Sequence, residues 1–84
     1  MAIDYRALRS LTARRLINAL VRDGFVLDRQ AGAHQHYFHR DDHRRVTVSF
    51  HHSGQTFAPK ILKVMIELQA RWSKADLRRL KLLK

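Results

Sequence analysis

Six histidines are the residues of this 84-residue chain best suited to chemistry. All of them fall within residues 34–52, at His34, His36, His39, His43, His51 and His52. An imidazole has an ordinary pKa of about 6.5, so its neutral and protonated forms are both available near neutral pH. Such a group of side chains can bind a transition metal, transfer protons in acid–base catalysis, or simply add charge to a solvated surface.

Residue types alone leave these three interpretations open. His34 and His36 are two residues apart, so on a strand they share one face and form a feasible metal-chelating pair, although the only carboxylates nearby are two aspartates of a predicted turn. The plainest interpretation leaves His36, His43 and His52 solvated on a basic surface. The third is cleavage of RNA, in which an imidazole takes a proton from a 2′-hydroxyl and returns one to the leaving 5′-oxygen, so that no metal is required.

Hydrophobic periodicity, glycine and proline divide the chain into helices and strands. The predicted elements are a helix over 12–23, strands over 25–30, 34–40 and 44–50, a helix from 59 to about 70, and a last helix over 73–83. In the two later helices the expected apolar residues are Ile61, Leu62, Met65, Ile66 and Leu68, and then Leu77, Leu80 and Leu83. This order predicts an α+β two-layer sandwich with a three-stranded antiparallel sheet and helices on one face.

The predicted sheet decides which histidines can meet. In the second strand His34, His36 and Phe38 share one face and Tyr37 lies on the other, so at most one of the two aromatic rings is free to stack on an unpaired base. Antiparallel pairing places the start of the second strand beside the end of the third. We therefore expect His34 and His51 to approach each other at one end of the sheet.

The charge of the chain indicates an anionic partner. Its 17 Lys and Arg against 7 Asp and Glu give a net charge of +10, which favours association with nucleic acid or with an acidic protein. The sequence has no cysteine and no apolar run of the roughly 20 residues that cross a bilayer. We expect a single domain over residues 1–84, located in the cytoplasm and without a membrane partner.

Several short motifs, in the right order and spacing, resemble the HicA family of mRNA interferase toxins. Residues 23–27 (DGFVL), 29–34 (RQAGAH) and 44–48 (RRVTV) follow the family's patterns D/N-G-[FW], R-x-x-G-S-H and R-x-V-T-V-P. A loop with histidines then leads to Pro59 at the start of a predicted helix, as in the family. The resemblance covers nearly the whole chain.

The resemblance implies a fold similar to the double-stranded RNA-binding domain, and a small ribonuclease that a HicB-type antitoxin neutralises. It places His34 on the family's catalytic histidine and Gly32 on the glycine of the same motif. The chain departs from the family pattern at Ala33, where serine is usual, and at Ser49, where proline is usual.

We interpret the chain as the toxin of a type II toxin–antitoxin system, a metal-independent endoribonuclease that acts on mRNA and needs no cofactor. His34 is the expected general base or acid, and His51 the second catalytic group. The expected RNA-binding residues are Gly32, Arg29, Arg44, Arg45 and Lys60. The alternatives are a catalytically inactive RNA-binding module of the same fold, and a protein whose main task is to bind an acidic partner.

Overall fold

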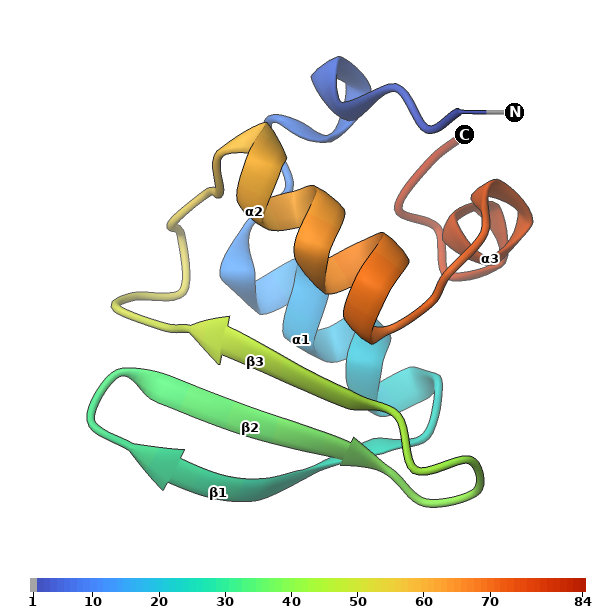
Figure 1. The fold of residues 1–84 in the computed structure, drawn as a ribbon. Helices are drawn as coiled ribbons and strands as arrows, with labels where there is room; N and C mark the ends of the chain where they lie inside the picture. Colours follow the sequence, from blue (N-terminus) through green and yellow to red (C-terminus); the bar gives the residue numbers. More distant parts are fainter. Residues whose placement is uncertain (1) are drawn as a thin grey trace.

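The computed structural model describes residues 2–84, with the predicted helices and strands in the predicted order (Figure 1). The elements are η1 (Tyr5–Leu8), α1 (Ala13–Arg22), β1 (Phe25–Ala31), β2 (His34–His39), β3 (Arg45–Ser49), α2 (Pro59–Lys63), η2 (Val64–Gln69) and α3 (Lys74–Arg79). The strands form one antiparallel sheet in the order β1-β2-β3. The predicted α+β fold, with the order α-β-β-β-α, is confirmed.

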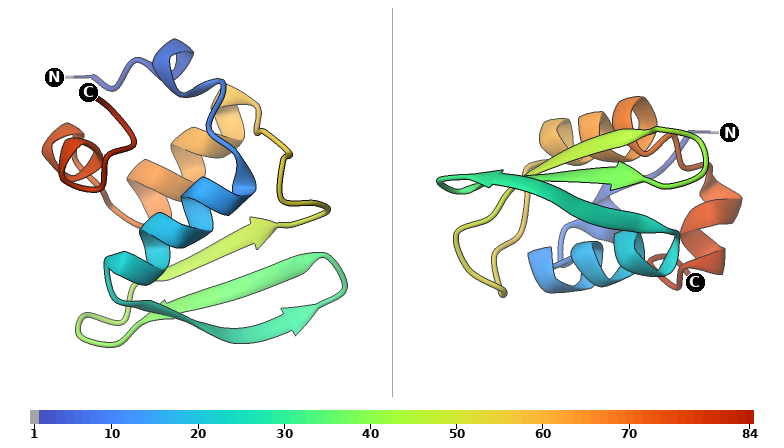
Figure 2. Two further views of the ribbon diagram at one scale, coloured as in Figure 1. Left: turned by 180° about the vertical axis from the view of Figure 1, so that it is seen from behind. Right: turned by 90° about the horizontal axis from the view of Figure 1, so that it is seen from below.

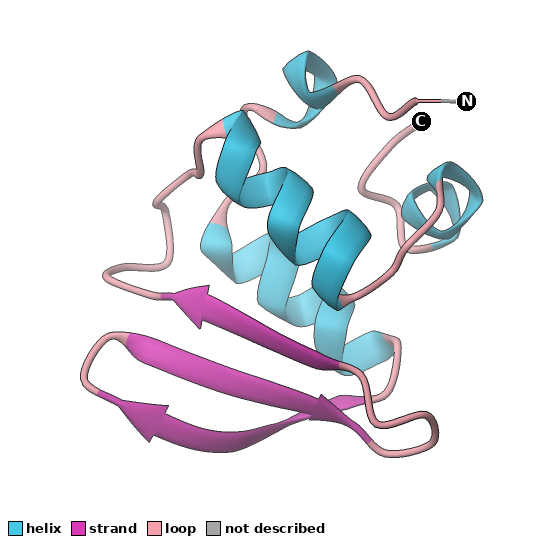
Figure 3. Ribbon diagram, in the orientation of Figure 1, coloured by secondary structure: helices cyan, strands magenta, loops and turns pink. Residues whose placement is uncertain are grey.

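The helices leave one face of the sheet open. In Figure 2, α1 packs behind the sheet, while α2 and η2 run beside the β3 edge. No helix of residues 2–84 lies over the front of β1 and β2 (Figure 3). Alternation along the strands turns Tyr37, Val46 and Val48 toward the covered side, where all three are buried. Their neighbours in the sequence therefore point to the open face.

The helix after Pro59 differs from its prediction in its second half. Ala70 N–H donates to the carbonyl of Met65, five residues back, so α2 continues into the π-helical η2. The wider turn displaces the residues that follow it around the helix axis. Leu68 was expected in the apolar stripe but is 69% exposed, and Gln69 faces β3 instead, where its side-chain oxygen accepts the N–H of Thr47 at 3.0 Å. Ile61, also expected in the stripe, is exposed as well.

The last helix is shorter than predicted. It begins as expected with a capping box between Ser73 and Asp76, but it ends at Arg79. Leu82 N–H donates to Leu77 O and Lys81 N–H to Arg78 O, with Lys81 in the left-handed conformation (φ 62°), which is the Schellman pattern of a helix end. Leu80, expected on the apolar side, is buried just beyond the helix. Because the chain reverses there, Leu82 is buried as well, and Leu83, which was also expected on the apolar side, is only partly buried.

The end of α1 joins distant parts of the chain at Asp23. The Asp23 carboxylate accepts hydrogen bonds from Trp72 Nε1 (2.8 Å), Arg79 Nη2 (2.8 Å) and Arg44 Nη2 (3.3 Å), and its carbonyl accepts one from His39 Nε2 at 2.6 Å. Burial alone raises the pKa of Asp23, but the hydrogen bonds from Trp72 and Arg79 and the nearby positive charges outweigh it and lower this pKa below its ordinary value. The charged aspartate thus holds α1 against the β2–β3 turn and the α3 segment.

Between α1 and β1, position 24 accommodates only glycine. Its φ of 107° lies in the region that favours glycine, and a Cβ atom there would lie 2.9 Å from His39 Nε2. The His39 ring is held by its bond to Asp23 and cannot move away without losing it.

Substitution of Gly24 by alanine should therefore destabilise the fold by about 2 kcal/mol or more, because backbone strain and a steric clash add together. Urea denaturation monitored by circular dichroism measures the loss. Gly54→Ala is the matched control, since the nearest atom to a Cβ at that loop position is His52 Nδ1, at 3.8 Å. Equal stability of the two variants would contradict this account of Gly24.

Candidate functional site

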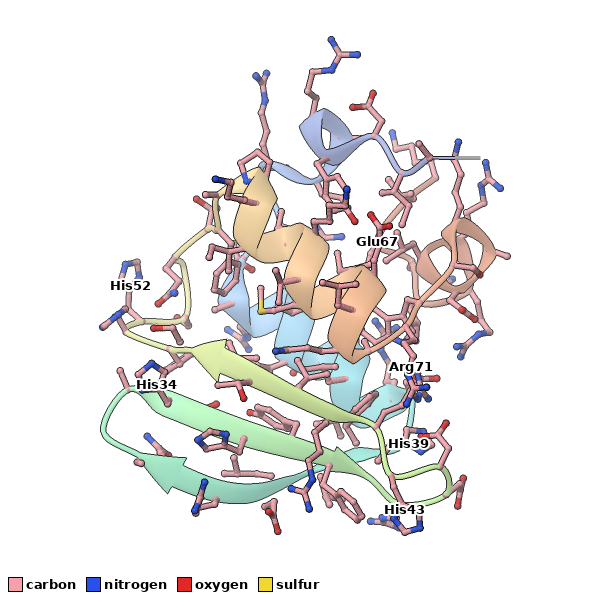
Figure 4. All side chains as sticks on the ribbon, in the orientation of Figure 1. His34, His39, His43, His52, Glu67 and Arg71 are labelled. Carbon is pink, nitrogen blue, oxygen red and sulfur yellow. The ribbon has the colours of Figure 1, made fainter. Side chains whose placement is uncertain are left out.

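The histidines do not form one cluster: five of them divide between the two ends of the sheet, and His36 lies in the middle of β2. Figure 4 shows His34 and His52 at the end where β1 turns into β2, and His39 and His43 at the opposite end. His51 precedes His52 in the loop after β3 and belongs to the first end. The exposed histidines of neighbouring segments therefore gather at the His34 end, where His34, His51 and His52 are all exposed.

His39 is a structural histidine. Its residue is 6% exposed, its Nε2 donates to the carbonyl of Asp23, and its Nδ1 accepts the N–H of Asp41 at 3.2 Å. The edge of its ring meets Phe25, with 4.9 Å between ring centroids. Both ring nitrogens form hydrogen bonds within the fold. His39 is therefore part of the group of residues bonded to Asp23, namely His39, Arg44, Trp72 and Arg79, which we call the corner at Asp23.

Cross-strand pairing arranges the open face in three rows. Residues that pair directly across antiparallel strands share a face. From the His34 end inward, the rows are Ala31–His34–Ser49, Arg29–His36–Thr47 and Val26–Phe38–Arg45. The outward side of β2 is thus the one that carries His34, His36 and Phe38.

The first row brings His34 and His51 to one place through Ser49. His34 pairs directly with Ser49, a position where side chains lie about 5 Å apart, and Ser49 Oγ lies 3.4 Å from His51 Nε2. Both histidines are exposed and Ser49 is half-buried. Two imidazoles with a hydroxyl between them form a group that can accept and donate protons on a bound substrate.

The second row depends on an irregularity in β1. The register shifts between Leu27 and Arg29, so that Leu27 pairs with Tyr37 on the covered face and Arg29 pairs with His36 on the open face. Without this bulge at Asp28, alternation would place Arg29 on the same face as Leu27. His36 Nδ1 lies 3.1 Å from Thr47 Oγ1, which fixes its ring orientation.

Gln55 holds the loop that carries His51. Its side-chain oxygen accepts the backbone N–H of His51 (2.5 Å) and of His52 (3.1 Å), and its Nε2 donates to the carbonyl of Ser49 at 2.6 Å. Its own carbonyl accepts the N–H of Ala13 at 2.8 Å, which ties the loop to the first turn of α1. The sequence did not indicate a role for Gln55, because a glutamine in a polar loop forms no recognisable motif. Its bonds to Ser49 and His51 are evident only in the folded structure.

The other predicted RNA-binding residues are not all on the open face. Arg29 and Arg45 lie on it. Gly32 is the first residue of the tight β1–β2 turn with φ 58°, and no atom lies within 4 Å of a Cβ there, so the glycine serves the backbone conformation. Lys60 is exposed in the first turn of α2, outside the three rows.

Arg44 lies in the corner at Asp23 and not on the open face. Its side chain is 15% exposed, and its guanidinium donates to Asp42, to Asp23 and to the carbonyl of Ala70. The hydrogen bond from Arg44 lowers the pKa of Asp42 below its ordinary value. With its donors used within the fold, Arg44 has a structural role, and the geometry does not support its interpretation as a phosphate contact.

Two further features bear on the interpretation of the site. Within residues 2–84, no three side chains of His, Asp or Glu gather closely enough to hold a metal ion. In the same part of the chain, no helix is both long and apolar enough to cross a membrane.

These features define a class: a small, strongly basic α+β protein whose open sheet face carries histidine and arginine side chains. Comparison with models of protein families matches residues 13–70 to the HicA toxin of bacterial toxin–antitoxin systems. The match spans α1, the whole sheet, α2 and η2. The chain therefore belongs to the HicA toxin family, and it is the toxin of a toxin–antitoxin system, with an antitoxin as its partner. Comparisons with curated proteins and with solved structures found no match.

Gln55→Ala should loosen the His51 loop while leaving the sheet intact. Three hydrogen bonds are lost, each contributing about 1 kcal/mol, so we expect amide exchange at His51 and His52 to accelerate at least about tenfold. Exchange at the β2 amides should not change. Hydrogen exchange followed by NMR measures both.

Gln55→Glu keeps the acceptor oxygen and should retain most of the protection. Unchanged exchange at His51 in the alanine variant would show that Gln55 does not hold the loop.

Proposed function

We propose that this toxin is a metal-independent endoribonuclease that cleaves mRNA, with His34 as its catalytic residue. The observation that supports this most directly is the placement of His34 on the open face, beside Ser49 and, through the Ser49 hydroxyl, beside His51. A strand of RNA can reach this face because α1 packs on the opposite side of the sheet. Arg29 and Arg45 give the same face the positive charge that phosphates require.

The two exposed histidines are suited to a reaction within the RNA itself. One imidazole, in its neutral form, takes the proton of a 2′-hydroxyl, whose oxygen then attacks the neighbouring phosphorus. The bond from phosphorus to the 5′-oxygen breaks, and the other imidazole, in its protonated form, gives its proton to that oxygen. The products are a 2′,3′-cyclic phosphate and a free 5′-hydroxyl. One imidazole gains a proton and the other loses one, so the step takes up and releases no net proton.

The neighbouring residues position the reacting groups. Arg29 lies one row from His34, about 7 Å along the strand, and its guanidinium stabilises the negative charge that develops on the phosphoryl oxygens. Ser49 orients the His51 ring, and Gln55 fixes the loop that carries it. The tight turn at Gly32 lets the RNA backbone pass close to His34. Lys60, exposed in the first turn of α2, adds positive charge outside the three rows.

The antitoxin partner is, in this proposal, of HicB type and covers the open face. An inhibitor of RNA cleavage must keep RNA away from His34, and the net charge of +10 favours an acidic contact surface on the partner. The toxin acts in the cytoplasm, where its substrate mRNA is found.

One departure from the family pattern favours a second candidate, an inactive RNA-binding module. Ala33 precedes His34 in the turn and has no hydroxyl to donate to a phosphate. Its carbonyl accepts the N–H of Phe50 at 2.7 Å, so its backbone role is kept. The two candidates differ in whether RNA is cleaved or only bound.

His34→Ala should abolish RNA cleavage and leave the fold unchanged, because the side chain is exposed and contributes no packing. We expect a loss of at least about 100-fold in the cleavage rate, the range that acid–base catalysis contributes. The assay follows single-stranded RNA in buffer with a chelator. His52→Ala, an equally exposed change in the neighbouring loop, serves as the control and should cleave normally.

Two outcomes would contradict the proposal. Unchanged cleavage by His34→Ala would remove this histidine from the mechanism. Binding of RNA by the unaltered protein without any cleavage, and equally by His34→Ala, would favour the inactive module.

A further inference from the structure

A second functional feature lies on the open face, at the end opposite to His34. We call Phe38, His43 and Arg45 the ledge. The guanidinium carbon of Arg45 lies 4.8 Å from the centroid of the Phe38 ring, and the rings of Phe38 and His43 lie 5.3 Å apart at 44°. Phe38 and Arg45 pair directly in the third row, and Figure 4 shows His43 at the end of the sheet opposite to His34.

The ledge is not part of the hydrophobic core. The β2 aromatic residue that packs inside is Tyr37, which is 4% exposed, and Phe38 points to the other face. Arg45 is well exposed, and Asp28 holds its guanidinium from the side at 3.4 Å. His43 has a φ of 64°, a costly backbone conformation for a residue other than glycine. A planar cation over an aromatic ring in solvent offers a flat surface on which a nucleic acid base can stack.

The distance from the catalytic end sets which base can reach the ledge. Phe38 follows His34 by four residues on one strand, which corresponds to about 13 Å. A stacked nucleic acid strand advances about 3.4 Å per nucleotide and a stretched one about twice as much, so the separation spans roughly two to four nucleotides. The row between them carries Arg29 and His36, both able to contact the intervening phosphates.

We propose that the ledge is a base-stacking subsite for single-stranded RNA, occupied by an unpaired base two to four nucleotides from the cleaved phosphate. This rests on the proposed function, since it takes His34 as the point of cleavage. Stacking on a guanidinium and a ring tolerates any base, so the subsite selects unpaired RNA rather than a sequence. A paired base in a duplex cannot present its face to the sheet, so a single-stranded segment is required on at least one side of the cut.

The test uses 12-nucleotide DNA single strands that contain one ribonucleotide, so that cleavage occurs at one phosphate. Each strand also carries a single abasic position, placed two, three or four nucleotides to either side of that phosphate. For the unaltered protein, one of these abasic positions should raise KM by roughly 5- to 150-fold and leave kcat unchanged. Arg45→Ala should show the same loss on the intact strand, and no further loss on the abasic one. Arg45→Lys keeps the charge but not the plane and should resemble Arg45→Ala.

Arg40→Ala is the matched control, because it removes an exposed arginine from the adjacent turn and should keep the full response to the abasic position. Additive effects of Arg45→Ala and the abasic position, or no abasic response on either side, would overturn the subsite. If the unaltered protein cleaves nothing, the same comparison is made as binding, by fluorescence anisotropy with all-deoxy strands. A response to the abasic position in binding without cleavage would uphold the ledge while refuting the nuclease.

Discussion

Where α1 passes into β1, one aspartate and one glycine join four parts of the chain. A partly buried carboxylate is costly unless hydrogen bonds replace its lost hydration, and Trp72, Arg79 and Arg44 supply them to Asp23. The carbonyl of Asp23 binds His39, and that ring can sit there only because Gly24 has no side chain. These bonds hold the end of α1 against β2, the β2–β3 turn and the α3 segment.

The open face follows from this arrangement and from the alternation of strand side chains. Once α1 covers one side, every second residue of β2 and β3 lies on the other side, and these positions carry two histidines, a phenylalanine, an arginine, a threonine and a serine. Placing reactive groups on paired strands keeps them in a fixed geometry, which acid–base catalysis needs. The proposed catalytic residue His34 and the ledge then lie on the same strand, separated by a fixed number of residues.

Much of this could be predicted from local patterns, and the exceptions share a physical cause. Helix periodicity, caps and strand alternation depend on near neighbours, so the element order and the approach of His34 to the end of β3 were accessible from the sequence. Which face of β2 looks outward was not, because that depends on the side of the sheet on which α1 packs. The chain reversal at Lys81, two residues beyond the end of α3, buries Leu82 and depends on a backbone conformation that lysine rarely adopts. Arg44 and Arg45 are adjacent arginines, so the sequence does not distinguish them. Only the folded chain shows that Arg44 is bonded within the corner at Asp23 and that Arg45 is exposed. The role of Gln55 in holding the His51 loop is evident only once that loop is folded onto β3.

The proposed function and the ledge together require RNA to lie along the open face, from His34 to the ledge. NMR titration of the ¹⁵N-labelled protein with a single-stranded RNA methylated at its 2′-hydroxyls tests it directly, since such a strand binds but cannot be cut. We expect chemical-shift changes at the amides of the three rows and of the His51 loop. Changes confined to α1 and α3, which carry many of the remaining arginines and lysines, would contradict it.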